Sequence, residues 1–291
     1  MLPEHQGFRR ALVFAFLGIL VCASAARADD RYVTAASHPL TVWRPAPIDF
    51  TGDGESDFAI VRNTGGAVTW WIADAASTAS SMQVFGLNTD RFIPADYDGD
   101  GKTDIAIWRS GPAGVAGFWI LRSSDGVVTF TPFGQTGDDP SVVGDYDGDG
   151  KADFAIQRNA GGNHAMFWIN QSTAGITQVL WGTPTDVIVP GDYDGDGKTD
   201  IAIIRGVGAS IQWWIRRSSD LGVTSMTFGL SATDFSCQAD YDGDGKTDIA
   251  IWRPSATPGQ TAFWVNKSSG GVLIRQWGLL GDYPVAAYNS H

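Results

Sequence analysis

Acidic residues recur in this chain at a spacing suited to binding a metal ion. A nine-residue segment, Asp-Tyr-Asp-Gly-Asp-Gly-Lys-Thr-Asp or a variant of it, begins at residues 49, 96, 145, 192 and 240. Oxygens at positions 1, 3, 5, 7 and 9 of such a loop can converge on one hard cation, with position 7 supplying its backbone carbonyl. Glycine at position 6 permits the sharp turn around the ion. Five copies in one register favour calcium sites over ordinary Asp-Gly turns.

The sequence therefore predicts up to five calcium ions, one in each loop. The predicted ligands are Asp49, Thr51, Asp53, Glu55, Asp57, Asp96, Asp98, Asp100, Lys102, Asp104, Asp145, Asp147, Asp149, Lys151, Asp153, Asp192, Asp194, Asp196, Lys198, Asp200, Asp240, Asp242, Asp244, Lys246 and Asp248. Thr51 replaces the aspartate of position 3, so the first site is expected to bind more weakly. Position 12 is isoleucine in every copy, which excludes an EF-hand with its bidentate glutamate.

The loops recur every 47 to 49 residues, and the segments between them repeat as well. An apolar strand follows each loop, then a strand with an aromatic pair such as Phe118-Trp119, a polar turn such as Arg122 to Gly126, and a strand ending in an aromatic-glycine pair such as Phe133-Gly134. A short strand then leads into the next loop. Four short strands in a repeat of this length predict an all-β fold, a β-propeller of four-stranded blades.

The number of blades has two readings in the sequence. Five blades, with the C-terminal strand Tyr283 to Tyr288 completing the first blade, is the simplest ring. A sixth blade shared between that strand and the segment from Tyr32 to Trp43 is the alternative. Both arrangements follow from the way propellers close, in which one terminus completes a blade that the other began and so removes exposed strand edges.

The combination of a Phe/Trp-Gly pair, a short strand, the acidic loop and the strand after it resembles the FG-GAP or VCBS repeat proteins. The resemblance extends over residues 43–288. It implies a propeller whose loops bind calcium between the first two strands of a blade, as in the integrin α-subunit. It also implies a binding role, because similar repeats occur in propeller lectins and as appendages on secreted bacterial enzymes.

The N-terminus has the pattern of a secretory signal. Arg9 and Arg10 precede an apolar run, and Ala26-Arg27-Ala28 offers a cleavage site after Ala28, with Ala25 as the alternative. We expect a signal peptide at 1–28, an N-terminal segment at 29–44 that can supply a closing strand, and the propeller at 45–291. The mature protein would be secreted, whether extracellular, periplasmic or bound to the cell surface, with no membrane span.

Cysteine and charge set further limits. Signal cleavage would leave Cys237 as the single cysteine, expected to be a buried small residue rather than a reactive thiol. The net charge is −12, from 32 acidic and 20 basic residues. Bound calcium would offset much of this charge, because the loops hold most of the aspartates. The absence of a basic cluster in the sequence argues against nucleic acid as a partner.

Arginine and aspartate also recur once in each repeat. Arginine ends the strand after each loop, at Arg62, Arg109, Arg158, Arg205 and Arg253, and an aspartate precedes the next loop, at Asp90, Asp139, Asp186, Asp234 and Asp282. We expect structural arginine–carboxylate pairs at the blade junctions. A ligand site on the same residues is the alternative. Its candidate residues, for a glycan stacked on tryptophan, are Trp181, Trp277, Asp186, Asp282, Arg205 and Arg253.

The sequence favours a binding or adhesion module for an extracellular glycan or protein. A secreted carbohydrate-active hydrolase or lyase on the same scaffold and a structural surface protein are the alternatives. Catalysis finds little support, because the histidines of the mature chain (His38, His164 and His291) do not recur and the acidic residues nearly all follow the repeat.

Overall fold

The computed structural model describes residues 49–52, 58–73, 79–238, 241, 244–257 and 259–276, which all belong to the compact unit Val33–His291. The predicted signal peptide, the segment 29–44 and the predicted closing strand Tyr283 to Tyr288 lie outside these residues. The predicted domain limits and the closure of the ring therefore stay predictions. In the part of the chain that is described, no helix is long and apolar enough to cross a membrane.

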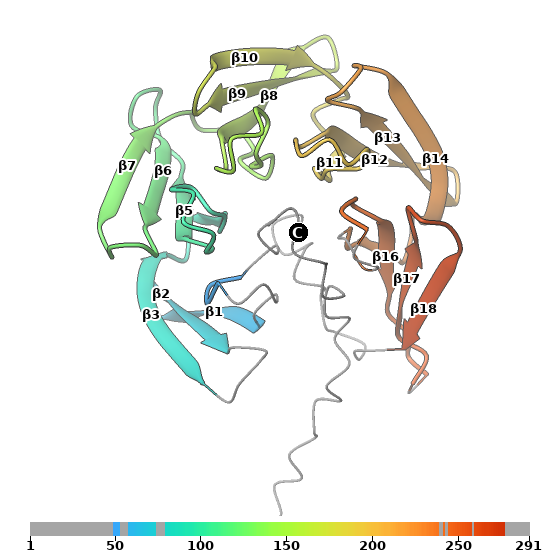
Figure 1. The fold of residues 1–291 in the computed structure, drawn as a ribbon, viewed down its shortest axis with the longest axis horizontal. Helices are drawn as coiled ribbons and strands as arrows, with labels where there is room; N and C mark the ends of the chain where they lie inside the picture. Colours follow the sequence, from blue (N-terminus) through green and yellow to red (C-terminus); the bar gives the residue numbers. More distant parts are fainter. Residues whose placement is uncertain are drawn as a thin grey trace, which may run out of the picture. The chain divides into compact units, whose positions relative to one another are not determined.

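The described residues form five antiparallel sheets, one for each repeat, set around a common centre (Figure 1). Two-residue strands lead into the acidic loops at β4 (Arg91–Phe92), β11 (Val187–Ile188) and β15 (Phe235–Ser236). The strands after the loops are β1 (Phe58–Thr64), β5 (Ile105–Arg109), β8 (Phe154–Gly161), β12 (Ile201–Val207) and β16 (Ile249–Arg253).

The other two strands of each sheet complete the blade toward the outside. The strands with the aromatic pairs are β2 (Ala67–Ala73), β6 (Gly117–Leu121), β9 (His164–Gln171), β13 (Ser210–Arg216) and β17 (Ala262–Asn266). The outermost strands are β3 (Ser80–Leu87), β7 (Val128–Pro132), β10 (Gly175–Leu180), β14 (Val223–Leu230) and β18 (Val272–Gln276). The predicted all-β propeller is confirmed.

Three sheets have the predicted four strands, in the orders β4-β5-β6-β7, β11-β12-β13-β14 and β15-β16-β17-β18. In the third sheet, β8 to β10, a single bridge between Asp139 and Gln157 takes the place of the short strand. The first sheet contains β1 to β3 among the described residues. The acidic loops and the inner strands lie toward the centre in Figure 1, and strands such as β7 and β14 lie at the periphery.

The period of two along each strand decides which blade a side chain packs against. In β5, Ile105 and Ile107 join the buried cluster with β2 of the preceding blade. Ala106 and Trp108, the residues between and after them, join a cluster with Phe118 and with Ile156 of the following blade. The alternation recurs in β12 and β16. Each junction between blades is therefore a small core that both neighbours build.

The aromatic pairs follow the same alternation. The first member faces its own blade's core and is fully buried in Phe118, Phe167 and Trp213. The second member is partly exposed and packs toward the preceding blade, as Trp119 and Trp214 do. Burying these large side chains on both faces of a sheet is the main apolar contribution of each repeat. The aromatic pairs whose side chains are described therefore pack between blades.

Cys237 lies directly after β15 and is a buried part of the last core cluster, with 1% of its surface exposed. Burial raises the pKa of its thiol to about 12. The thiolate is therefore scarce at neutral pH, and a reactive role is disfavoured. The expectation of a buried, unreactive cysteine is confirmed.

Two phenylalanines of the second blade test the account of the core. Phe118 is 0% exposed and Phe130, on the outer strand β7, is 40% exposed. We expect Phe118→Ala to lower the free energy of unfolding by about 3–5 kcal/mol, because it leaves a cavity in a junction between blades. Phe130→Ala, the matched control, should cost less than half as much. Urea unfolding followed by circular dichroism measures both, and equal losses would contradict the assignment of the core.

Candidate metal centres

Carboxylates gather in three of the acidic loops. The clusters are Asp96, Asp98 and Asp104, then Asp145, Asp147 and Asp153, then Asp192, Asp194 and Asp200. Within each cluster one carboxylate oxygen from each residue lies within 4.8 Å of the others. The members are positions 1, 3 and 9 of the loop, and each cluster can hold a metal ion. Three negative charges at this distance repel one another strongly unless a cation or protons offset them.

The aspartate of position 9 closes each loop. It is 0% exposed in Asp104, Asp153, Asp200 and Asp248. One of its carboxylate oxygens accepts the backbone N–H of position 2, as Asp104 does from Tyr97 at 3.0 Å, and the other accepts a backbone N–H from the polar turn after the third strand, as from Ser123 at 2.7 Å. The same pair of bonds recurs in the following three loops. This aspartate therefore joins the loop to its own blade.

Position 1 shapes the turn, and in the third loop position 3 supplies an unused oxygen. Asp145 accepts the N–H groups of Gly148 and Gly150 at 2.6 and 2.9 Å, which holds the loop in its curled form. Asp147, at position 3, has one carboxylate oxygen that is buried and has no hydrogen-bond partner. A buried carboxylate oxygen without a partner is costly, and a cation would remove that cost. The donor set of the third loop thus fits a hard cation.

The polar turn after the third strand also takes part in the site, which the sequence alone did not reveal. Its hydroxyl groups donate to the loop carboxylates, from Ser123 and Ser124, from Ser172 and Thr173, from Ser218 and Ser219, and from Ser268. The first hydroxyl reaches position 5 and the second reaches position 3. The signal was the recurrence of two consecutive hydroxylated residues, the first of them 18 to 20 residues after position 9, and it becomes meaningful only once the strands pair.

Position 5 makes hydrogen bonds to position 7 and to the polar turn. The position-5 carboxylates, such as Asp100, are not members of the three clusters and accept hydrogen bonds from the serine of the turn and from the N–H of position 7. The lysines of position 7 donate that N–H at 2.9 Å in all four later loops. Their assignment as ligands stays a prediction, while positions 1, 3 and 9 are brought together.

The first and last loops are described in part. Asp49 is 1% exposed, and the hydroxyl of Thr51 donates to its carboxylate at 3.4 Å. Asp53, Glu55 and Asp57 of the first loop and Asp240 and Asp242 of the last lie outside the described residues. Within the last loop, Asp244 and Asp248 contact the turn at Ser268 as their counterparts do. The weaker first site stays a prediction.

Burial changes the ionisation of the clusters. Burial, with the charges of neighbouring aspartates, raises the pKa of Asp153 to about 6, and burial raises the pKa of Asp200 to about 6. Burial likewise raises the pKa of Asp96, Asp104 and Asp145 above the usual range. Without a cation these carboxylates therefore compete for protons at mildly acidic pH.

Neighbouring loops are linked to one another. The N–H of position 8 donates to the position-1 carbonyl oxygen of the preceding loop, from Thr103 to Asp49, from Ala152 to Asp96, from Thr199 to Asp145 and from Thr247 to Asp192, at 2.6 or 2.7 Å. The lysine of position 7 also lies against the position-4 glycine of the preceding loop. A Cβ atom on Gly52 would come within 2.8 Å of the Lys102 side chain. The five loops thus form one connected series.

The recurring arginines pair with aspartates, as the structural interpretation predicts. The ion pairs are Arg109–Asp90, Arg158–Asp138, Arg205–Asp186 and Arg253–Asp234, at 2.5 to 2.8 Å. One assignment was wrong, because the partner in the third blade is Asp138 and not Asp139. Asp138 stands four residues after Gly134, as Asp90 stands four after Gly86, although Asp138 lies one residue further from its next loop than Asp90 does.

Each of these aspartates also closes a turn. Asp90 accepts the N–H of Leu87 at 2.7 Å directly after the aromatic-glycine pair, and Asp138, Asp186 and Asp234 do the same in their blades. The paired arginine lies over the second aromatic residue, with Arg109 5.8 Å from the Trp119 ring and Arg205 5.2 Å from the Trp214 ring. A buried carboxylate, a bidentate arginine and an indole therefore hold each blade corner together.

The residues considered for a glycan site lie at these corners. Asp186 is buried and paired with Arg205, and Asp234 similarly holds Arg253. Trp181 is half-buried and packs against the core between the third and fourth blades. Trp277 and Asp282 lie outside the described residues. Their part in ligand binding stays a prediction, and the contacts that are described serve the fold.

Comparison with known protein families identifies the type of repeat. The family model for the FG-GAP-like repeat matches residues 49–107, 96–156 and 145–203, each match running from one acidic loop into the strand after the next. No curated protein matches the chain.

Solved structures of AofleA from Arthrobotrys oligospora and of a triple arginine-to-alanine mutant of it are similar to this chain. Their sequence identities are 11% and 12%. They cover 82% and 81% of this chain and 80% of their own, each with a TM-score of 0.43.

The raised pKa values of Asp153 and Asp200 predict opposite pH responses with and without a divalent cation. The folded pKa lies above the ordinary value, so the metal-free protein should lose stability as pH rises from about 4 to about 6. A bound cation needs the deprotonated carboxylates, so metal affinity should instead fall as pH drops through about 6. Melting of dialysed protein at several pH values, with and without excess cation, measures both slopes. Parallel slopes would contradict the prediction.

The links between loops yield a second prediction. A Cβ atom on Gly144 would lie 2.6 Å from the Thr199 hydroxyl, whereas the junction before it has alanine at both equivalent positions, Ala95 and Ala152. We expect Gly144→Ala to destabilise the protein by about 1–3 kcal/mol through overpacking. Adding Thr199→Ala should restore most of the loss. Urea unfolding of the two single variants and the double variant measures the coupling, and additive effects would refute the contact.

Proposed function

The chain belongs to the FG-GAP-like repeat family, and on that premise we propose that it is a secreted, calcium-stabilised binding module for an extracellular glycan. The observation that carries the calcium assignment is the third loop. There Asp145, Asp147 and Asp153 bring their carboxylates within 4.8 Å, and a buried oxygen of Asp147 has no partner. Oxygen-only donors of this kind select a hard cation such as calcium over softer transition metals.

Positions 1, 3 and 9 of each loop would hold the ion. When bound, calcium would supply positive charge that offsets the repulsion among the carboxylates, and in the third loop it would also contact the Asp147 oxygen that lacks a hydrogen-bond partner. The chain's own part is to fix the geometry: Gly148 and Gly150 orient Asp145, and the backbone of Tyr146 and Ser172 orients Asp153. Because each loop bonds to the next, loading would stabilise the ring as a whole.

Binding rather than catalysis is the activity that the chain supports best. The polar groups that recur once per blade are engaged in loops and corners, where they hold the fold. Among the described residues the one histidine, His164, lies exposed at a hairpin. A propeller presents several blade junctions side by side, which suits weak contacts to a repeated polymer such as a polysaccharide. The predicted signal peptide supports secretion, where calcium concentrations suit loops of modest affinity.

Removal of calcium should destabilise the protein strongly. A site occupied at ten times its dissociation constant adds about 1.4 kcal/mol, so five predicted sites add on the order of 7 kcal/mol. For a domain of this size we expect the melting temperature in millimolar calcium to exceed that in EDTA by well over ten degrees.

Two variants serve this measurement by differential scanning calorimetry. Asp147→Asn should reduce the calcium-dependent shift, because it weakens a proposed ligand. Gln178→Ala, on the exposed outer strand β10, is the control and should leave the shift unchanged. Superimposable curves for the wild-type protein in calcium and in EDTA would disprove the calcium proposal.

A further inference from the structure

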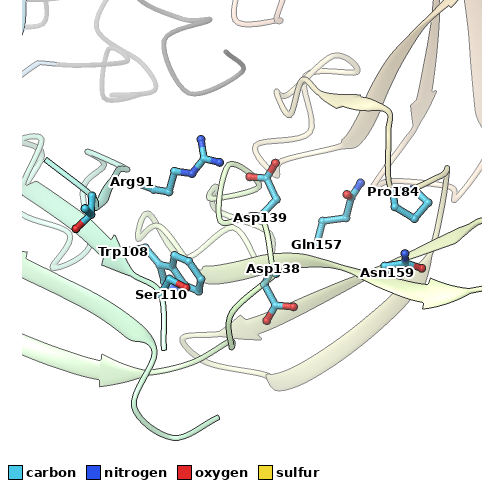
Figure 2. A pocket seen from close by; sticks show the side chains of 10 residues that line it. Arg91, Trp108, Ser110, Asp138, Asp139, Gln157, Asn159 and Pro184 are labelled. Carbon is cyan, nitrogen blue, oxygen red and sulfur yellow. The ribbon is translucent and has the colours of Figure 1, made fainter. Parts of the chain in front are cut away.

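A polar cavity of about 360 Å³ lies between the second and third blades. Figure 2 shows Arg91 and Trp108 of the second blade on one side and Asp139 and Gln157 of the third blade near them. Ser110 and Asn159 also line the cavity. The volume is at the lower end of the range for small-molecule sites.

The polar residues of this cavity stand at a position of the repeat where other blades have apolar residues. The short inner strand and the strand after the loop face each other as Arg91 and Trp108 in the second blade, and as Asp139 and Gln157 in the third. The equivalent pairs are Val187 and Ile204 in the fourth blade, and Phe235 and Trp252 in the fifth. Two consecutive blades therefore carry polar groups where the later two carry apolar ones, and these polar groups line the same cavity.

Gln157 is the most informative of these residues. Its side chain is 5% exposed, and its amide nitrogen Nε2 is buried without a hydrogen-bond partner. A buried donor left unsatisfied lowers stability, whereas an isoleucine stands at the equivalent place in the fourth blade. An acceptor oxygen on a bound molecule would satisfy this donor.

The junction between the fourth and fifth blades shows the same place with apolar residues. Its cavity has a volume of about 210 Å³. Val187 and Ile204 line it where Arg91 and Trp108 line the larger cavity, and Phe235 stands where Asp139 does. The larger and more polar junction is thus a local property of the second and third blades.

We propose that this cavity binds one neutral saccharide residue, an inference that rests on the glycan-binding function proposed above. Neighbouring hydroxyls on a sugar ring each donate and accept hydrogen bonds. They can therefore accept from Gln157 and Arg91 and donate to Asp139. Trp108 is 3% exposed, so only the small part of its surface that lines the cavity contacts the sugar. Ser110 and Asn159 add neutral polar groups at the rim.

The charges of the cavity favour a neutral ligand over an ion. Asp138 points away from Asp139 in Figure 2 and is bound to Arg158 at 2.7 Å. One oxygen of Asp139 accepts the N–H of Ser141 at 2.9 Å and leaves the other oxygen for a ligand. The remaining charges, Arg91 and Asp139, are equal and opposite. A ligand with a single carboxylate or ammonium group would be attracted by one of these two charges and repelled by the other.

The test exchanges the polar pair for the residues of the fourth blade. The double variant Asp139→Val with Gln157→Ile installs a pair that this chain already folds with. We expect the wild-type protein to bind at least one neutral monosaccharide from a panel of hexoses, deoxyhexoses and N-acetylhexosamines, measured by saturation-transfer NMR in millimolar calcium. The double variant should bind it at least tenfold more weakly while its melting temperature stays equal or rises. Ser231→Ala, at the junction between the fourth and fifth blades, should bind as the wild type does.

Retention on immobilised polysaccharides separates this inference from the proposed function. Equal binding of the sugar and equal retention for wild type and double variant would show that the protein binds glycans elsewhere, which overturns the cavity assignment alone. A wild-type protein that is retained by no polysaccharide and binds no monosaccharide overturns both proposals. If the double variant unfolds, Gln157→Leu takes its place. The same loss of sugar binding is expected for Gln157→Leu. Unchanged sugar binding by this variant would rule out the site.

Discussion

Repulsion among buried carboxylates is the constraint on which the rest of this structure depends. Three loops gather acidic oxygens within 4.8 Å of one another in the described part of the chain, and the fold must supply compensating groups before any cation arrives. It does so with backbone N–H groups from within the loop and with backbone and hydroxyl groups of a turn some 20 residues later. The blade is therefore organised from its loop outward, because the turn between the third and fourth strands has to reach the loop.

The second organising feature is the sharing of each core between two blades. Alternate residues of a strand such as β5 belong to different cores, so no blade buries its apolar faces alone. The corner of arginine, buried aspartate and indole holds the position of each blade relative to that shared core. Backbone bonds between loops add a second connection on the inner side. Stability in such an array is a sum of units and of the interfaces between neighbours, and both terms are large here.

The repeat made the fold and the loops predictable from the sequence, because strand number, strand period and ligand spacing are all local properties. The partner of Arg158 was assigned incorrectly, since two adjacent aspartates stand there and only the turn geometry distinguishes Asp138 from Asp139. The serine turns and the loop-to-loop bonds were not foreseen, because they join residues of different strands or different repeats. Gln157 likewise looked like an ordinary strand residue until its pairing with Asp139 placed both beside Arg91.

The contact between successive loops has a consequence for how such a chain can evolve. An added Cβ atom on Gly144 would lie 2.6 Å from the Thr199 hydroxyl, and one on Gly191 would lie 2.7 Å from the Thr247 hydroxyl, so at these two junctions glycine before one loop is matched to threonine in the next. A repeat that is duplicated or exchanged meets new neighbours on both sides, and here any residue larger than glycine would collide with that threonine. Recombination between unlike repeats is therefore constrained by contacts between consecutive loops, independently of any ligand or partner.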